Sequence, residues 1–166
     1  MSKRFFISLL VILLLGLDLN SQKLKSRHTF ALGPSEFLLD GNPFQIISGE
    51  MHPARIPAEY WRHRIQMAKA MGCNTVSAYL FWNLHEAEEG IYDFRTGNRD
   101  ISRFITTAQE EGMWVIIRPG PYVCAEWEFG GLPPYLLRHH GIKVRCMDPV
   151  YMKAAERYIS RLSDLL

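Results

Sequence analysis

The sequence is poor in cysteine and has little excess charge of either sign. Its 166 residues include three cysteines, Cys73, Cys124 and Cys146, an odd number with no metal-type spacing. We expect thiols that are mostly buried, although one disulfide is possible in an exported chain. The formal net charge is +2. No basic cluster occurs beyond the extreme N-terminus, which argues against a nucleic-acid partner.

Nucleotide-binding and metal motifs are also missing. The sequence contains neither a G-x-G-x-x-G motif nor a P-loop. The histidines His52, His85, His139 and His140 have no recognisable metal-ligand spacing, so we expect no zinc site. Hydrophobic residues make up 48% of the chain, and this composition is typical of a globular domain with its own core.

The longest apolar run lies at the N-terminus, where Lys3-Arg4 precede the segment from Phe5 to Leu17. A basic pair followed by such a run is typical of a secretory signal peptide. The run is shorter than the roughly 20 residues of a transmembrane helix. We predict a signal peptide over residues 1–22, with an uncleaved anchor as the alternative. The mature protein would then be exported to the periplasm or the extracellular space, with no membrane attachment.

Strand and helix patterns alternate along the rest of the chain. Short apolar runs predict buried strands at residues 44–48, 74–81 and 113–117. Helical periodicity predicts helices at residues 57–72, 100–112, 133–139 and 148–166. Asp100 and Asp148 are the expected N-caps, Pro57 opens the first helix, and Gly72 is its expected C-cap. Residues 143–146 are expected to be extended. Two further apolar segments, 29–32 and 36–39, predict a small N-terminal β-hairpin.

Acidic and aromatic side chains gather directly after the third predicted strand. Pro119-Gly-Pro121 ends this strand, because proline has no N–H to donate to a sheet. The loop beyond it carries Tyr122, Glu126, Trp127 and Glu128. Sites in α/β proteins form beyond the carboxyl ends of strands. Carboxylates accept hydrogen bonds from hydroxyl groups, and flat rings cover the apolar face of a pyranose. The loop therefore predicts a carbohydrate site.

The order of elements favours a fold that the chain is too short to complete. A (β/α)8 barrel needs about 250 residues, whereas this chain has 166. An open doubly wound sheet needs fewer units, but such sheets commonly bind phosphate and no phosphate motif is present. We therefore predict an α/β fold that is a partial (β/α)8 TIM barrel, containing the first three to four βα units after the N-terminal hairpin.

Three motifs resemble glycoside hydrolase family 35. They are Gly49-Glu-Met-His52 with Arg55-Ile-Pro57, then Ala78-Tyr-Leu-Phe-Trp-Asn-Leu-His-Glu86, then Arg118-Pro-Gly-Pro-Tyr-Val-Cys-Ala-Glu-Trp127 with Gly130-Gly-Leu-Pro133. The resemblance covers residues 29–166. It implies a retaining, exo-acting β-galactosidase with a TIM-barrel catalytic domain, of which residues 23–166 would be the truncated N-terminal portion. It implies no cofactor, and a galactoside-containing oligo- or polysaccharide as the partner.

The resemblance also implies roles for four residues. In the family, the residues that match Tyr79 and Glu126 contact galactose hydroxyls, and those that match Cys124 and Ala125 line the same pocket. Both catalytic glutamates lie further along the family's sequence, so none is expected here. The residues alone would allow Glu126 and Glu128 as an acid–nucleophile pair, because retaining enzymes hold two carboxyls about 5–5.5 Å apart. Catalytic pairs in barrels come from different strands, which favours binding.

Several neighbouring residues have open roles. Arg118 is expected to form an ion pair with a carboxylate under the pocket. Glu50 and His52 are expected to orient their neighbours, with direct contact to the ligand as the alternative. Tyr79 could instead be a packed core tyrosine. Trp82, His85 and Trp127 suit packing at the barrel rim as well as they suit contact with a sugar.

Two functions besides β-galactoside hydrolysis stay open. The first is another TIM-barrel glycosidase, such as a β-glucan or β-mannan hydrolase. The second is an inactive sugar-binding remnant.

Overall fold

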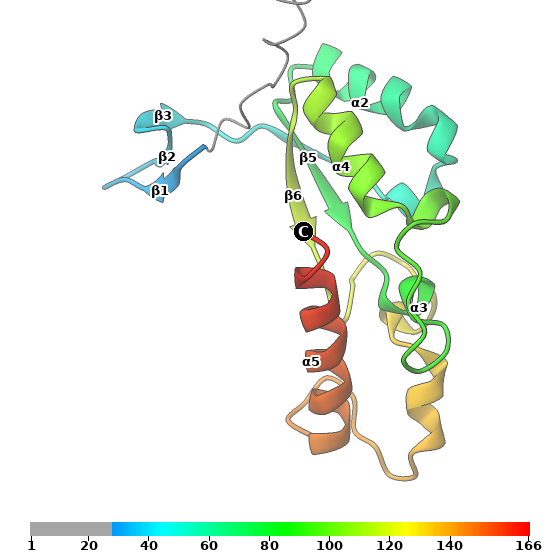
Figure 1. The fold of residues 1–166 in the computed structure, drawn as a ribbon. Coiled ribbons are helices and arrows are strands. Elements are labelled where there is room, and N and C mark those ends of the chain that lie inside the picture. The colour runs from blue at the N-terminus through cyan, green and yellow to red at the C-terminus, as the bar shows by residue number, and fades with distance from the viewer. Residues whose placement is uncertain (1–27) are drawn as a thin grey trace, which may run out of the picture. The chain divides into compact units, whose positions relative to one another are not determined.

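The computed structural model describes residues 28–166. The predicted signal peptide at residues 1–22 lies outside the described residues. The chain divides into two compact units, Met1–Gln45 and Ile46–Leu166, and each is described by itself (Figure 1).

The described part of the first unit is a three-stranded antiparallel sheet. Its strands are β1 (Phe30–Leu32), β2 (Phe37–Leu39) and β3 (Asn42–Phe44), in the order β1-β2-β3. The turn between β2 and β3 is tight because Asp40 and Gly41 both have positive φ, 52° and 77°. The strand expected at residues 44–48 is therefore wrong. Phe44 pairs with Phe37 in this sheet instead, and the next strand begins only at Ser48.

The second unit is built on a parallel sheet. Its strands are β4 (Ser48–Glu50), β5 (Thr75–Tyr79) and β6 (Trp114–Arg118), and their spatial order follows the sequence. Gly49 pairs with Val76, which in turn pairs with Val115. The sequence placed β5 and β6 within a few residues of their observed ends. All three strands therefore end at one edge of the sheet.

Two helices cover one face of this sheet (Figure 1). They are α2 (Trp61–Ala70), which follows the 3₁₀ turns Pro53–Arg55 and Ala58–Tyr60, and α4 (Ile101–Glu110), which follows the 3₁₀ turn Gly97–Arg99. The predicted cap of α4 is confirmed, since the Asp100 carboxylate accepts a hydrogen bond from the Arg103 N–H at 2.9 Å. Helices and strands share a buried apolar cluster: Ala58, Trp61, Ile65, Ala68, Val76, Ala78, Phe104, Ala108 and Met113.

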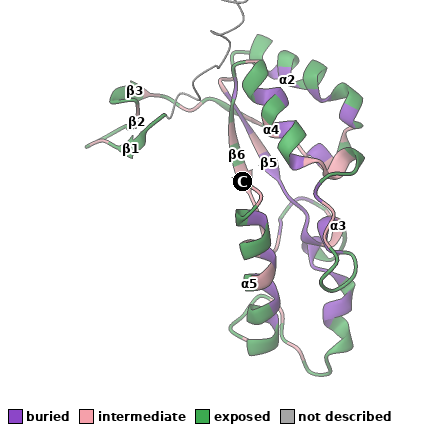
Figure 2. Cartoon of the chain, in the orientation of Figure 1, coloured by how far each residue is buried: buried purple, intermediate pink, exposed green. Residues whose placement is uncertain are grey.

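The opposite face of β6 is open. Trp114 and Ile116 are 37% and 38% exposed, whereas Val115 and Ile117 pack against the core beneath the helices. The prediction of a buried strand at residues 113–117 is therefore wrong for Trp114 and Ile116, and Val115 and Ile117 are only partly buried. The physical reason is that β6 is the last strand of the described sheet and carries helices on one side only (Figure 2).

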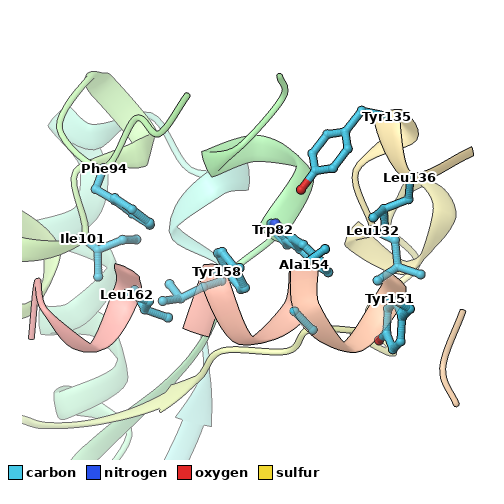
Figure 3. Close-up of a cluster of buried hydrophobic side chains, with 12 residues drawn as sticks. Trp82, Phe94, Ile101, Leu132, Tyr135, Leu136, Tyr151, Ala154, Tyr158 and Leu162 are labelled. Carbon is cyan, nitrogen blue, oxygen red and sulfur yellow. The ribbon is translucent and has the colours of Figure 1, made fainter. Parts of the chain in front are cut away.

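A second core lies beyond the carboxyl ends of the strands. It joins the short helix α3 (Trp82–His85), the 3₁₀ helix Pro134–Arg138 and the long helix α5 (Pro149–Ser163). Trp82 stacks on Tyr158 at the centre of this core, with ring centroids 5.1 Å apart (Figure 3). The buried members of the cluster are Leu80, Trp82, Phe94, Ile101, Leu132, Tyr135, Leu136, Tyr151, Ala154, Ala155, Tyr158 and Leu162.

The predicted start of α5 is confirmed, whereas its predicted end and the prediction for residues 143–146 are not. Asp148 caps the helix by accepting hydrogen bonds from the Val150 and Tyr151 N–H groups at 3.0 and 3.1 Å. The helix ends at Ser163, three residues before the expected end. Residues 143–146 form a turn with Arg145 at φ 61°, so the expected extended segment is wrong. Within residues 28–166, the structure contains no helix with the length and hydropathy of a membrane span.

Candidate functional site

Three side chains meet where the parallel strands end. Glu50 is the last residue of β4, Tyr79 of β5 and Arg118 of β6. The Arg118 guanidinium forms an ion pair with the Glu50 carboxylate. It also lies over the Tyr79 ring, with Cζ 3.8 Å from the ring centroid. The ion pair expected for Arg118 is confirmed, and its partner is Glu50.

A second set of contacts joins the segment after β4 to the loop after β6. The Glu50 carboxylate lies 2.8 Å from His52 Nε2, and Arg55 Nη1 lies 2.6 Å from His52 Nδ1. A guanidinium can only donate hydrogen bonds, so His52 Nδ1 accepts and the ring hydrogen is on Nε2, facing Glu50. Arg55 Nη2 donates to the backbone carbonyls of Ala125 and Glu126, both at 2.7 Å. The expectation that Glu50 and His52 orient their neighbours agrees with these contacts.

The loop after β6 has an uncommon backbone. Glu126 and Phe129 have φ angles of 47° and 49°, in the left-handed region that residues with a side chain rarely adopt. Such a conformation costs about 1–3 kcal/mol and needs support from its surroundings. The Val123 N–H donates to the Gly130 carbonyl at 2.8 Å and closes the loop. This hydrogen bond and the Arg55 contacts hold the loop from both sides.

The four predicted binding residues lie at different depths. Tyr79 is 8% exposed and Ala125 is 1% exposed, and they belong to one small core cluster with Phe81 and Val123. Cys124 and Glu126 are exposed on the loop. The structure therefore places Tyr79 in the same buried cluster as Ala125, whose neighbours Cys124 and Glu126 are exposed.

The expectation of mostly buried thiols is wrong. Cys73 is half-buried, Cys124 and Cys146 are exposed, and all three are free thiols. Cys124 lies in the loop after β6, and Cys146 lies in the turn before α5. Both side chains face solvent at these positions, so composition alone overestimated their burial.

Two aromatic residues complete the cluster. Phe81 and Trp127 stack with their ring centroids 4.1 Å apart, and the Arg55 guanidinium lies 5.6 and 5.2 Å from these two centroids. Trp127 Nε1 donates to Asn83 Oδ1 at 2.9 Å. The sequence analysis assigned no role to Arg55, Phe81 or Asn83. Strand alternation could have found Phe81, because it places Phe81 on the same side as Tyr79; no local signal marks the other two.

Trp82 and His85 are packing residues, which closes one open alternative. Trp82 is fully buried against Tyr158, and its Nε1 donates to the Glu86 carboxylate at 2.6 Å. His85 stacks on Phe94 with centroids 4.8 Å apart and donates from Nδ1 to the Asp93 carbonyl at 2.9 Å. Burial lowers the pKa of His85 below its ordinary value of 6.5. Neither ring is accessible to a sugar.

A small hollow lies next to Asn83, the hydrogen-bond partner of Trp127. Its volume is about 170 Å³, and its lining residues are Asn83, Ala87, Glu128, Phe129, Leu132 and Pro134. Glu128 is exposed. Within residues 28–166, no group of three or more histidine, cysteine, aspartate and glutamate side chains is arranged to hold a metal ion. The edge as a whole presents the exposed carboxylates of Glu50, Glu126 and Glu128 beside aromatic rings, a combination suited to a polyhydroxy ligand.

Comparison with known proteins identifies the family. The family model described as "Glycosyl hydrolases family 35" matches residues 36–166. The chain belongs to glycosyl hydrolase family 35. The matched range contains the strand-end cluster and all four of the predicted binding residues.

Curated relatives of this family 35 chain carry the name β-galactosidase. The β-galactosidase of Xanthomonas manihotis is 43% identical over 155 residues, which are 93% of this chain and 26% of that protein. The mouse (Mus musculus) β-galactosidase is 45% identical over 139 residues, covering 82% of this chain and 21% of its own length. The human (Homo sapiens) β-galactosidase-1-like protein 3 is 45% identical over 130 residues, or 78% and 20% of the two chains. The chain thus spans about a quarter or less of these relatives.

Solved structures support the fold class. A GH5_18 protein from Streptomyces cattleya, solved with GlcNAc, matches with a TM-score of 0.55 and 16% identity over 70% of this chain and 29% of its own. An exo-β-1,4-mannosidase from Opitutaceae bacterium strain TAV5 matches with a TM-score of 0.51 and 22% identity, covering 74% and 22% of the two chains. These two structures and the family 35 chain share an α/β fold.

Proposed function

We propose that this chain forms part of a retaining β-galactosidase that removes terminal β-D-galactose, with Tyr79, Cys124, Ala125 and Glu126 lining the pocket for that sugar. The observation that supports this role is the convergence of Tyr79 and the 124–126 loop at the strand ends. This edge is where α/β barrels build their sites. Membership of family 35 supplies the substrate class.

The chemistry assigned to these residues is binding and positioning. Glu126 accepts hydrogen bonds from sugar hydroxyls, and the backbone of Cys124 and Ala125 lines the pocket beside the Tyr79 ring. A retaining glycosidase also needs an acid and a nucleophile about 5–5.5 Å apart. We assign neither role to a residue of this chain. Holding the galactose ring in register lets those carboxyls reach its anomeric carbon, which contributes to the rate through orientation alone.

The wider proposal concerns the fold and the location. Residues 23–166 would form the first three to four βα units of a (β/α)8 barrel, preceded by the N-terminal β-hairpin. Residues 1–22 would direct export to the periplasm or the extracellular space. The substrate there would be a galactoside-containing oligo- or polysaccharide, and no nucleic acid, membrane or cofactor would take part.

The substitution Glu126→Gln in the complete gene product tests the pocket. It keeps the size of the side chain and removes the charge that strengthens hydrogen bonds to hydroxyl groups. We expect turnover of aryl β-galactosides to fall by about tenfold or more, since a hydrogen bond to a charged group contributes about 1.5–3 kcal/mol.

The matched control is Glu128→Gln, which changes an exposed acid two residues further along the same loop. Activity of Glu126→Gln at the wild-type level would contradict the pocket assignment. Aryl β-glucosides and β-mannosides in the same assay separate this proposal from the other glycosidases, because only galactosides should be turned over well.

A further inference from the structure

We infer that Arg55, aligned by His52, is a positioning residue that holds the loop at residues 124–127 in its sugar-binding conformation. The inference deepens the proposed function and rests on it for the identity of the ligand. The contacts that carry it lie within the second unit and join segments far apart in the sequence: Arg55 and the carbonyls that it binds are separated by 70 and 71 residues.

The two carbonyls that Arg55 binds have an unusual geometry. In an extended chain, successive carbonyl groups point in opposite directions. Here the carbonyls of Ala125 and Glu126 converge on a single nitrogen, Arg55 Nη2, at 2.7 Å each. The positive φ of Glu126, 47°, turns the second carbonyl to meet the first. The Arg55 contact and the strained backbone at Glu126 therefore depend on each other.

The Arg55 guanidinium is itself held in place by further contacts. Its Nη1 donates to His52 Nδ1, and His52 Nε2 in turn donates to Glu50, the partner of Arg118. Its plane lies near the stacked rings of Phe81 and Trp127. A guanidinium can satisfy these contacts together because its donors are fixed in a planar fork, whereas a lysine ammonium cannot.

The contact between Arg55 and the loop leaves the Glu126 side chain available to bind a sugar. The hydrogen bonds are made by the backbone of Ala125 and Glu126, so the Glu126 carboxylate is left free of Arg55 and able to accept sugar hydroxyls. Arg55 thus acts through the loop and does not need to touch the sugar. Removing it should let Glu126 relax toward an ordinary φ, which moves both the carboxylate and the neighbouring Cys124.

The experiment uses the complete gene product with Arg55→Lys and Arg55→Ala. The control is Arg62→Lys, because Arg62 also forks onto two acceptors, the carboxylates of Glu110 and Glu111, but lies on the outer surface of α2. Binding of methyl β-D-thiogalactoside is measured by calorimetry. We expect both Arg55 variants to bind about tenfold or more weakly, since hydrogen bonds from a charged donor are involved, and the control to bind as the wild type.

Chemical rescue separates positioning from general stabilisation. Arg55 is exposed to solvent, so free guanidinium at millimolar concentration can reach the place that Arg55→Ala vacates. We expect it to restore part of the thiogalactoside affinity of Arg55→Ala and none of that of Arg55→Lys, in which the site is filled. Where Arg55→Ala fails to fold, Arg55→Lys alone decides the outcome. Wild-type affinity in Arg55→Lys would overturn the inference.

Thiol labelling tests the role of Arg55 without any sugar, and therefore separately from the proposed function. The exposed thiol of Cys124 can be labelled with a disulfide reagent in a Cys146→Ser background, and its rate reports the loop's conformation. We expect this rate to change in both Arg55 variants and not in Arg62→Lys. If the wild type fails to bind the thiogalactoside, the proposed function fails and the labelling rate still decides; an unchanged rate would overturn the role of Arg55.

Discussion

Gly130 offers a direct test of how tightly the loop after β6 is packed. A Cβ atom built on Gly130 would lie 2.0 Å from Cε2 of Tyr122, 2.4 Å from its Cδ2 and 2.6 Å from its Cζ. These distances lie far inside van der Waals contact, so the ring must move. Tyr122 packs against the second core and carries the Arg145 guanidinium over its ring, 3.9 Å from the centroid. A substitution at Gly130 should therefore disturb more than its own backbone.

The cost of Gly130→Ala has two parts. Gly130 has a φ of 61°, and a left-handed residue with a Cβ atom costs about 1–2 kcal/mol. Displacing a packed ring adds about 1–3 kcal/mol. We expect Gly130→Ala to lower the free energy of unfolding by about 2–5 kcal/mol. Gly141→Ala is the matched control, because Gly141 has a φ of 78° with no atom within 4 Å of the built Cβ. This variant should lose only the free energy that the left-handed conformation costs.

Urea titration followed by tryptophan fluorescence measures both variants under the same conditions. Combining Gly130→Ala with Tyr122→Ala should recover most of the free energy lost to displacement of the ring, since the clashing ring is then absent. Equal destabilisation by Gly130→Ala and Gly141→Ala would refute the reasoning, because it would show that the Tyr122 ring yields without cost.

Two further predictions concern buried ionisable groups. Glu86 is fully buried and accepts hydrogen bonds from Trp82 Nε1 and the Gly90 N–H at 2.6 and 2.8 Å. Glu86→Ala leaves the buried Trp82 N–H without its partner and should lower the free energy of unfolding by about 1–3 kcal/mol; a loss under about 1 kcal/mol in urea titrations would contradict this. Burial lowers the pKa of His85 below 6.5, so the unfolded chain binds this proton more readily than the folded one. The stability from neutral His85 is complete above about pH 6.5 and is lost as pH falls toward the folded-state pKa. His85→Gln should remove this part of the pH dependence, and an unchanged profile would count against it.

Features set by neighbouring residues could be predicted from the sequence. Asp100 and Asp148 were identified as helix caps because an N-cap acts on backbone groups within three residues. Gly72 was identified as the end of α2 for a similar local reason, and its φ of 93° agrees. The parallel strands β5 and β6 were also found, because each is a short β-rich segment between turn signals.

Features set by distant residues could not be predicted. Phe44 joins β3 because it pairs with Phe37, and nothing in residues 44–48 alone reveals that partner. Trp82 became a core residue through Tyr158, which lies on α5. The role of Arg55 depends on carbonyls 70 and 71 residues away.

The four predicted binding residues illustrate what the sequence could predict and what it could not. Their motif marks a site, and the structure places Tyr79 and Ala125 in one cluster. Their contact with galactose stays a prediction. The path from Glu50 through His52 and Arg55 to the 124–126 loop became visible only in three dimensions.

A crystal structure of the complete gene product with galactose would show whether the sugar binds at the strand ends. We expect the sugar at the ends of β4, β5 and β6, with a galactose hydroxyl about 2.5–3.0 Å from a carboxylate oxygen of Glu126 and the Tyr79 ring beside it. Galactose bound elsewhere, with the Glu126 side chain directed away from it, would rule out the pocket proposed here.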